Sequence, residues 1–503
     1  MLTFGSDLLQ LLRPLVLLSC ARYALSFLAE NSQTVLSFPF THAPASLPHD
    51  NPTHSFWTHT PGANLLASEG STGTLTDEAD VCIIGSGITG VSAAYHLANA
   101  VSNPAFPLPA GKSQLRAVLL EARDFCSGAT GRNGGNLTPY EFQHFREVRR
   151  RFGDEDSLKH YAIEHYSSTE MVRIAREAGW ADEADIFEGG HIDAILTEEL
   201  LAEVHADVDS AKAAGKNVNI TWVDREEMNS TYGTYNWGIR SPGYNLWPLK
   251  FVNKLFLEAN STTRSLDLRL HTHTPVNQVV PLDSEFHPWA LVTPRGPINC
   301  SRVLHATNGY ASHLLPQLAS SAGILPVRGQ VIATRASVAL STITKISWAG
   351  NSGYWFPRPA PANTTGPENP LIILGGRRED AKPPYEVGTT DDSTLDATIS
   401  KSLRAFLPTL FPRFYDPDTQ PEMEWTGIMG YTPLDVPLVG RVPSRKHRAQ
   451  YMSAGYAGHG MPRAYGCAEA VIGMMLADMR EIVWIAPKWF PKSFLTRTGG
   501  VLT

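Results

Sequence analysis

Three glycine-rich stretches contain the residue types that hold phosphorylated cofactors. In the first, GSGITG, three glycines form a G-x-G-x-x-G pattern that follows the short apolar run 81–84. The first glycine of such a pattern permits a tight turn, the second lets the backbone approach a pyrophosphate, and the third lets a helix pack closely on the strand. The helix N-terminus offers free N–H groups and the positive end of its dipole to the phosphates. We therefore predict a dinucleotide-binding turn at Gly85, Ser86, Gly87, Ile88, Thr89 and Gly90.

A carboxylate is expected at the end of the next strand. The segment RAVLLEARD predicts a strand that ends in Glu121, where a dinucleotide-binding fold needs a carboxylate to accept the ribose hydroxyls. A Pro-rich surface insertion, NAVSNPAFPLPAGKSQ, makes the spacing from Gly90 longer than usual. Ala122 and Arg123 are predicted to lie beside Glu121 at the cofactor.

The second glycine-rich stretch, CSGATGRNGG, spans residues 126–135 and cannot build a hydrophobic core. Its backbone N–H groups and small polar side chains can instead surround phosphate and the edges of a cofactor. Arg132 could add positive charge there. The residues predicted to contact the cofactor are Ser127, Ala129, Thr130, Arg132, Asn133, Gly134, Gly135 and Asn136.

The segment ARDFCSGATGRNGGN resembles the FAD-proximal loop of the D-amino-acid-oxidase-like family of flavoenzymes, especially its amine-oxidising branch. Later segments extend the resemblance to most of the chain beyond residue 80. The segment from VNQVV to ATNGY is similar to the family's antiparallel excursion and return strand, which implies that the Val276 backbone binds the adenine. ILPVRGQVIAT and YWFPRP resemble the start of the substrate domain, and EWTGIMGYTPLDVPLVGRVP resembles the start of the closing flavin-binding region.

The third glycine-rich stretch, GYAGHG, resembles the turn that closes the flavin site in this family. The resemblance implies that the helix after it, which begins with small residues, points its N-terminus at the flavin N1 and C2 carbonyl, where negative charge collects on reduction. The residues predicted to bind the cofactor here are Gly455, Gly458, His459, Gly460 and Met461.

The resemblance implies an FAD-dependent oxidoreductase that oxidises a C–N bond of an amine or amino acid by hydride transfer to flavin N5. No general base is assigned, because a neutral amine does not require one. Tyr354 and Trp355 are candidates for an aromatic pocket that holds an amine by cation–π attraction, or for packing of a sheet. Arg463 could bind a substrate carboxylate, or pair with the flavin or with Glu469. An enzyme acting on an alcohol or hydroxy acid, and a non-catalytic FAD-binding assembly protein, remain alternatives.

Departures from the family pattern bear on the flavin and its reactivity. Arg132 stands where one group of relatives has a flavin-linking histidine, and the segment TGIMGYTP lacks the cysteine of another group. FAD is therefore expected to be non-covalent. Ile373 and Pro462 stand where simple sarcosine-type oxidases have lysines for oxygen activation and substrate binding, so oxygen and another electron acceptor both remain open.

The expected fold is α/β: a three-layer FAD-binding Rossmann-like domain interleaved with an α+β substrate domain built on a large, mostly antiparallel sheet. We expect segments 81–84 and 117–121 to be adjacent parallel strands, and residues 147–240 to be mostly helical. The expected division is 1–34 a signal or anchor segment, 35–79 an extended lead-in, 80–146, 245–310 and 421–485 the FAD-binding domain, 147–244 and 311–420 the substrate domain, and 486–503 a C-terminal tail. The lead-in could wrap on the domain through Phe56 and Trp57.

Composition and charge narrow the function classes. The chain has 503 residues and a net charge of -7, which gives no basic field for nucleic acid. Five cysteines lie far apart, and most are expected to be buried thiols rather than a dense disulfide framework. The histidines at 271–273 fit an ordinary strand better than a metal site, and no metal is expected.

The N-terminal apolar segment leaves localisation open between the secretory pathway and the cytoplasm. It could be a secretory signal, a single membrane anchor interrupted by Arg13 and Arg22, or an amphipathic extension. Any membrane association is expected only through this segment. Sequons that could carry N-glycans lie at Asn219, Asn229, Asn260, Asn299 and Asn363, and a further one at Asn136 falls in the predicted cofactor loop.

Overall fold

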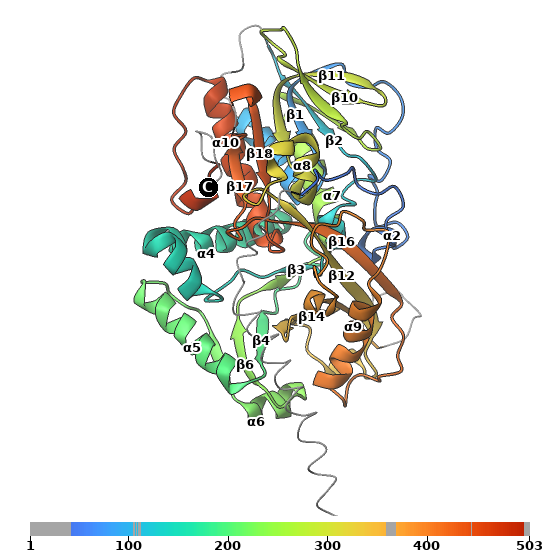
Figure 1. The fold of residues 1–503 in the computed structure, drawn as a ribbon, viewed down its shortest axis with the longest axis vertical. Helices are drawn as coiled ribbons and strands as arrows, with labels where there is room; N and C mark the ends of the chain where they lie inside the picture. Colours follow the sequence, from blue (N-terminus) through green and yellow to red (C-terminus); the bar gives the residue numbers. More distant parts are fainter. Residues whose placement is uncertain are drawn as a thin grey trace, which may run out of the picture.

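The computed structural model describes residues 42–103, 106, 108, 112–358, 369–443 and 445–496. The apolar segment at 1–34 and the sequon at Asn363 lie outside the described residues. In Figure 1 one large sheet lies above the other, each at the centre of one domain, and the chain passes several times between them.

The first sheet carries the predicted parallel strands. Its main strand order is β17-β18-β11-β1-β2-β8, and β9 and β10 extend it as an antiparallel hairpin next to β11. The parallel register pairs Val81 with Ala117 and Ile84 with Leu120, so the predicted adjacency of the two segments is confirmed. The strands are β1 (Glu78–Ile84), β2 (Leu115–Leu120), β8 (Leu266–His271), β9 (Gln278–Pro281), β10 (Trp289–Thr293), β11 (Gly296–His305), β17 (Leu438–Arg441) and β18 (Gln450–Ala454).

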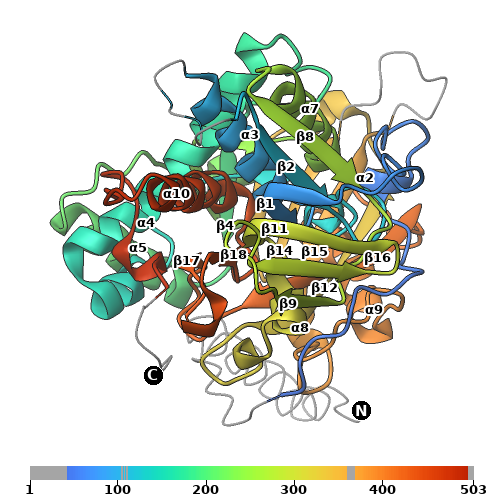
Figure 2. The same ribbon diagram turned by 90° about the horizontal axis from the view of Figure 1, so that it is seen from above.

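Helices cover one face of this sheet, and the β9–β10 hairpin covers the other (Figure 2). The helices are α3 (Ile88–Ser102), α7 (Pro248–Ser261) and α10 (Met461–Met479). Small residues allow α10 to lie close to its neighbours, because a Cβ on Gly466 would come within 3.0 Å of the Ser167 hydroxyl of α4 (Phe145–Glu177). The three layers confirm the predicted architecture.

The second sheet has the order β16-β12-β15-β14-β13-β4-β6-β5, and every pair is antiparallel except β13 with β4. Its strands are β4 (His191–Ile195), β5 (Thr221–Val223), β6 (Trp237–Ser241), β12 (Leu325–Arg335), β13 (Ser347–Gly350), β14 (Gly353–Arg358), β15 (Leu371–Gly376) and β16 (Met423–Tyr431). The remaining α-helices and β-strands of the described residues are α2 (Phe56–His59), α5 (Glu198–Ala213), α6 (Arg225–Glu227), α8 (Ala311–Leu314), α9 (Ala397–Leu410) and the paired strands β3 (Asn136–Leu137) and β7 (Tyr244–Asn245).

Residues 147–240 are mostly helical, as predicted, because they contain most of α4 and all of α5, and they also include β4, β5 and most of β6 of the second sheet. Two other expectations about the elements need correction. Met423–Tyr431, assigned to the cofactor domain, pairs with β12 and belongs to the second sheet. The strand at the histidine cluster ends at His271, because His273 adopts a left-handed conformation with φ of 49°.

The four cysteines in the described part of the chain form one disulfide and two buried thiols. Cys82 of β1 and Cys300 of β11 form a disulfide between adjacent strands, which the sequence did not predict because 218 positions separate them. Cys126 and Cys467 are free and buried, as expected for small apolar side chains. Within the described ranges, no helix is both long and apolar enough to cross a membrane.

Candidate active site

A cavity of about 730 Å³ lies between the two domains, and all three glycine-rich stretches contribute to its wall. The predicted cofactor residues that line it are Gly85, Gly87, Ile88, Thr89, Glu121, Ala122, Arg123, Ala129, Thr130, Arg132, Asn133, Gly134, Asn136, Val276, Gly458, His459, Gly460 and Met461. Five predicted residues do not line it: Ser86, Gly90, Ser127, Gly135 and Gly455. Segments separated by hundreds of positions thus meet around one space.

The first glycine turn has the backbone geometry that its pattern predicts. Gly85 has φ of 107°, a conformation that side chains rarely adopt. Gly90 packs so closely that a Cβ there would lie 1.9 Å from the Gly85 carbonyl oxygen, so this glycine serves helix packing rather than the cavity. A Cβ on Gly87 would lie 3.1 Å from the Thr130 hydroxyl, at the N-terminus of α3. The turn therefore presents bare backbone to the cavity.

Glu121 directly follows β2 and reaches the same turn. Its carboxylate accepts hydrogen bonds from the Ser86 amide (3.1 Å) and hydroxyl (2.7 Å), and from the Arg123 amide (3.1 Å). Ser86 is fully buried and orients this carboxylate from behind. The arrangement places an acceptor for hydroxyl groups at the cavity wall, as a ribose would require.

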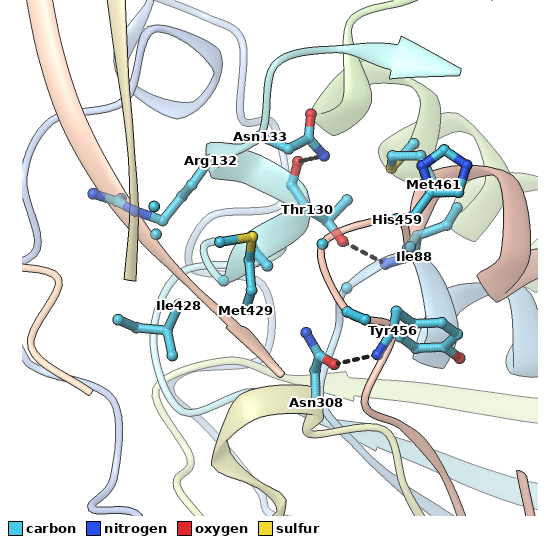
Figure 3. Close-up of a pocket in the computed structure, with 18 of the residues that line it drawn as sticks. Ile88, Thr130, Arg132, Asn133, Asn308, Ile428, Met429, Tyr456, His459 and Met461 are labelled. Carbon is cyan, nitrogen blue, oxygen red and sulfur yellow. Dashed lines mark hydrogen bonds between the residues drawn. The ribbon is translucent and has the colours of Figure 1, made fainter. Parts of the chain in front are cut away.

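Several buried polar atoms in the wall are suited to a polar ligand. The Thr130 hydroxyl accepts a hydrogen bond from the Ile88 amide at 3.0 Å and links the first two glycine stretches (Figure 3). Asn136 Oδ1, Thr307 Oγ1 and Tyr310 Oη are buried at the cavity and have no hydrogen-bond partner among the described residues. Because unpaired buried polar groups are costly, these atoms and the bare glycine backbone fit a large polar cofactor such as FAD.

Arg132 of the second stretch, which was predicted to supply charge to the cofactor, lines the cavity and shares one buried carboxylate, that of Asp392, with Arg123. The guanidinium of Arg123 forms two 3.0 Å hydrogen bonds with the buried carboxylate of Asp392. Arg132 lies 3.7 Å from the same carboxylate and bonds to the Thr426 and Thr53 carbonyl oxygens. Burial lowers the pKa of Arg132 to about 10. Its side chain extends away from Thr130 in Figure 3.

The third glycine stretch forms the turn before α10. Gly455 and Gly458 have φ of 85° and 78°, and the Gly455 amide donates to Asn308 Oδ1 at 3.0 Å. A Cβ on Gly458 would lie 2.8 Å from the Tyr431 hydroxyl, so this glycine allows the second sheet to approach the turn. Gly460 precedes the first residue of α10, whose N-terminus therefore opens at the cavity.

A buried carboxylate forms hydrogen bonds with the turn and with the start of α10. Glu164 of α4 is 1% exposed and accepts hydrogen bonds from His459 Nε2 (3.0 Å), Arg463 Nε (2.8 Å) and the Tyr140 amide (2.7 Å). The His459 ring also stacks on Tyr140 at 3.9 Å. Burial raises the pKa of Glu164, but the charges of His459 and Arg463 and these hydrogen bonds outweigh it and hold the pKa at about 2.

Arg463 therefore has a different position from the one predicted for a substrate ligand. Its guanidinium is committed to Glu164 and to the Asp435 carbonyl oxygen (3.3 Å), and it does not line the cavity. It does not pair with Glu469 either, because that carboxylate accepts a hydrogen bond from Tyr166. Its ion pair with a fully buried acid is structural.

The two aromatic candidates lie on opposite faces of the second sheet. Tyr354 lines the cavity, whereas Trp355 is 2% exposed and packs against Trp348 and Phe406 on the far side. This separation follows from the strand itself, since consecutive side chains in β14 point to opposite faces. Only Tyr354 is placed to contact a ligand.

Sequence reasoning missed several cavity residues on the second sheet and on the approach to α4. They include Tyr140, His191, Asp193, Arg378, Glu379 and Tyr431. Burial raises the pKa values of Tyr140, Tyr354 and Tyr431, so all three phenols are neutral hydrogen-bond donors at neutral pH. No local motif marks these residues, because the strand order alone brings them together. Among the described residues, no group of three His, Cys, Asp or Glu side chains could hold a metal ion.

The first strand of a parallel sheet leads into a G-x-G-x-x-G turn and a helix, and the next strand is followed by a carboxylate. This combination defines a dinucleotide-binding protein. The family model described as "FAD dependent oxidoreductase" (DAO) matches residues 80–474. The chain therefore belongs to this family of FAD-dependent oxidoreductases.

Individual relatives are distant but match over most of their length. The chain is 24% identical to the "probable oxidoreductase OrdL" of Rhizobium meliloti (strain 1021) over 408 residues, which cover 80% of this chain and 85% of the relative. It is 23% identical to the gamma-glutamylputrescine oxidoreductase of Escherichia coli (strain K12) over 404 residues, 79% and 84% of the two chains. The crystal structure of glycine oxidase from Geobacillus kaustophilus superposes with a TM-score of 0.61 at 19% identity, covering 84% of this chain and all of that one.

Proposed function

We propose that this enzyme oxidises the C–N bond of an amine that carries a carboxylate, with non-covalent FAD as the hydride acceptor. Two of the similar proteins are named for amine substrates, glycine and γ-glutamylputrescine. Bound FAD would supply the electron-accepting chemistry, and the protein would supply orientation, exclusion of water and charge at the amine and carboxylate. Non-covalent attachment is supported by the sequence, since Arg132 stands where one group of relatives has a flavin-linking histidine and TGIMGYTP contains no cysteine.

The observation that carries the carboxylate assignment is an unpaired cation in the cavity wall. Arg378 follows β15 and lies 5.4 Å from the centre of the Tyr431 ring. Among the described residues it forms no salt bridge, and only the Tyr385 carbonyl oxygen accepts from it, at 3.3 Å. The other cavity arginines have partners: Arg123 and Arg132 face Asp392, and Arg377 forms two 2.8–2.9 Å hydrogen bonds with Asp380.

Tyr431 connects Arg378 to the glycine turn. One face of its ring meets the guanidinium, and its hydroxyl lies beside Gly458. A carboxylate bound by Arg378 would therefore hold its amine on the side of Tyr431 that faces the turn before α10. The guanidinium fork suits a carboxylate in a bidentate arrangement.

The experiment that tests this proposal is anaerobic reduction of the bound flavin by matched pairs of amines and their carboxylated analogues. We expect the carboxylated amine of each pair to reduce the flavin faster than its analogue that lacks the carboxylate. Arg378→Ala should remove this preference by raising the KM for the carboxylated amine about tenfold or more. Arg378→Lys should restore part of the preference, and Arg335→Ala, a surface cation paired with Glu422, is the control. Reduction only by alcohols or hydroxy acids, or by no donor, would overturn the proposal.

We also propose that the chain matures in an oxidising compartment. The Cys82–Cys300 disulfide supports this, because such bonds persist mainly in secreted and extracytoplasmic proteins. Asn219, Asn229 and Asn260 are exposed sequons, whereas Asn299 lies within β11 between two strands. Glycosidase treatment of the protein from its native host should remove mass at these three exposed sites and not at Asn299. A protein that is not secreted, carries no N-glycans and lacks the Cys82–Cys300 disulfide would contradict this proposal.

A further inference from the structure

The segment before the first sheet crosses both domains and reaches the cofactor cavity. We call residues 45–57 the strap. They lie outside the matched family region, which begins at residue 80. In Figure 2 the blue strap passes beside β16 before it enters α2. Its path joins the two domains at the edge of the cavity.

The end of the strap binds three consecutive residues of the second glycine stretch. The Ser55 hydroxyl donates to the Gly131 carbonyl oxygen at 2.7 Å. Arg132 Nη2 donates to the Thr53 hydroxyl at 2.6 Å. Trp57 Nε1 donates to the Asn133 carbonyl oxygen at 2.5 Å. The conformation of this cofactor loop is therefore fixed from outside by a segment that is distant in sequence.

The beginning of the strap forms part of the cavity itself. Ser46, Leu47 and Pro48 line the cavity. On the side of the first domain, the Ala45 amide donates to the Ser312 hydroxyl at 2.9 Å. The His49 carbonyl oxygen accepts from Arg123 Nη1 at 2.9 Å.

The strap also bonds to the second domain. The Thr53 amide donates to the Asp392 carbonyl oxygen at 2.8 Å, and the Thr426 amide donates to the Thr53 hydroxyl at 2.9 Å. Asp392 is the acid that Arg123 and Arg132 share. The strap thus shares its anchor points with the charge network beside the cavity.

Packing makes this attachment strong. The Trp57 side chain is completely buried, and its ring stacks parallel to Phe356 of β14 with 6.4 Å between centroids. Trp247 Nε1 donates to the Trp57 carbonyl oxygen at 3.0 Å. A buried tryptophan with both its own N–H and its backbone bonded is an anchor rather than a surface contact.

We infer that the strap is a part of the FAD site that the family domain does not contain. It closes one side of the cavity through Ser46–Pro48 and holds the 131–133 loop in its cofactor-binding conformation. FAD can leave only after the strap detaches from the loop, so strap contacts set the rate of FAD release.

Point variants of the strap test this inference through the release of FAD, followed by the fluorescence of free flavin after dilution. Trp57→Phe removes the donor to Asn133 and keeps an aromatic ring, and Ser55→Ala removes the bond to Gly131. Each variant is expected to release FAD about three- to tenfold faster than the unaltered protein. Trp222→Phe, at a partly exposed tryptophan of β5, is the control. Release rates equal to the control in both strap variants would overturn the inference.

A cut in the folded holoenzyme tests the strap by breaking its covalent link to the rest of the chain, so that only its noncovalent contacts hold it in place. A specific protease site is inserted at the exposed turn Pro61–Gly62, where an added Cβ would meet nothing within 4 Å. A matched site is inserted between Ser284 and Glu285, in the exposed β9–β10 loop. Cleavage at the first site should accelerate FAD release, and cleavage at the second should not. Unchanged release after complete cleavage at the first site would refute the inference even where the point variants fail to fold.

Discussion

The two walls of the cavity are built in different ways. The wall from the first domain contains the bare backbone of the glycine turns, at glycines 85, 87 and 458 and the N-terminal ends of α3 and α10, beside side chains such as Glu121 and Thr130. The wall from the second domain contributes the side chains of Tyr354, Tyr431 and Arg378, which project from strands or their ends. A backbone wall binds a group common to all flavoproteins of the family, whereas a side-chain wall can change with the substrate.

This difference predicts that substitutions in the two walls have separable effects. Changes in the first wall should remove the cofactor, and changes in the second should alter substrate preference or stability while flavin is retained. The predictions below test this separation.

The largest effect is expected for Gly87→Val in the backbone wall. A branched side chain at this position would meet the Thr130 hydroxyl and occupy the space where a pyrophosphate would approach. We expect complete loss of FAD from the purified protein, measured as the flavin-to-protein absorbance ratio, with a folded circular dichroism spectrum. Full flavin content in a folded variant would show that the turn does not bind the cofactor.

Trp355→Ala should be the most destabilising change in the second domain. Its side chain is 2% exposed among Trp348, Phe406 and Phe411, so truncation leaves a large void. A loss of about 3–5 kcal/mol in the free energy of unfolding is expected. The KM for amines should hardly change in the folded fraction. A KM effect larger than that of Tyr354→Phe would place Trp355, rather than Tyr354, at the substrate.

Glu164→Gln should destabilise the protein on the order of 3 kcal/mol at pH 7, because it removes the partner of Arg463 and His459. The folded pKa of Glu164, about 2, lies below its ordinary value of 4.5. Its ionised form therefore stabilises the fold above pH 4.5, and this contribution is lost as the pH falls from 4.5 toward 2.

The variant should accordingly lose part of the acid sensitivity in that window, as measured by urea unfolding at a series of pH values. Glu469→Gln, at the other acid near α10, is the control. An unchanged pH dependence in Glu164→Gln would mean that Glu164 is not ionised in the native state.

The smallest effect is expected for Tyr354→Phe. The change removes one neutral hydroxyl from the cavity wall and keeps the ring, so the KM for amines should rise about fivefold with unchanged flavin content. Steady-state kinetics on a carboxylated amine measures it. A loss of flavin instead would assign Tyr354 to the cofactor wall.

The sequence predicted the backbone wall well and the side-chain wall poorly, for a physical reason. Cofactor-binding turns are local, so the spacing of the glycines at 85, 87 and 90 already contains their geometry. Glu121 follows from the same local unit. Tyr431 and Arg378 come together only through the order of β16, β12 and β15, which no short motif encodes. Arg463 was misplaced because its partner, Glu164, lies 299 positions away on α4.

The strap shows a further limit of prediction from the sequence. Its composition predicts an extended segment, and Trp57 was expected to contact the domain, but only the structure shows that it binds residues 131–133. Hydrogen bonds from side chains to distant carbonyl oxygens leave no periodic pattern in a sequence.

The most direct test of the account is anaerobic reduction of the bound flavin by a carboxylated amine that carries deuterium on the carbon next to nitrogen. If that carbon donates the hydride, bleaching of the oxidised flavin should be slower with the deuterated substrate than with the ordinary one, and one imine-derived carbonyl product should form per flavin reduced. Equal rates would show that breaking this C–H bond does not limit reduction. No reduction by any amine, with reduction by a hydroxy acid, would contradict the central claim.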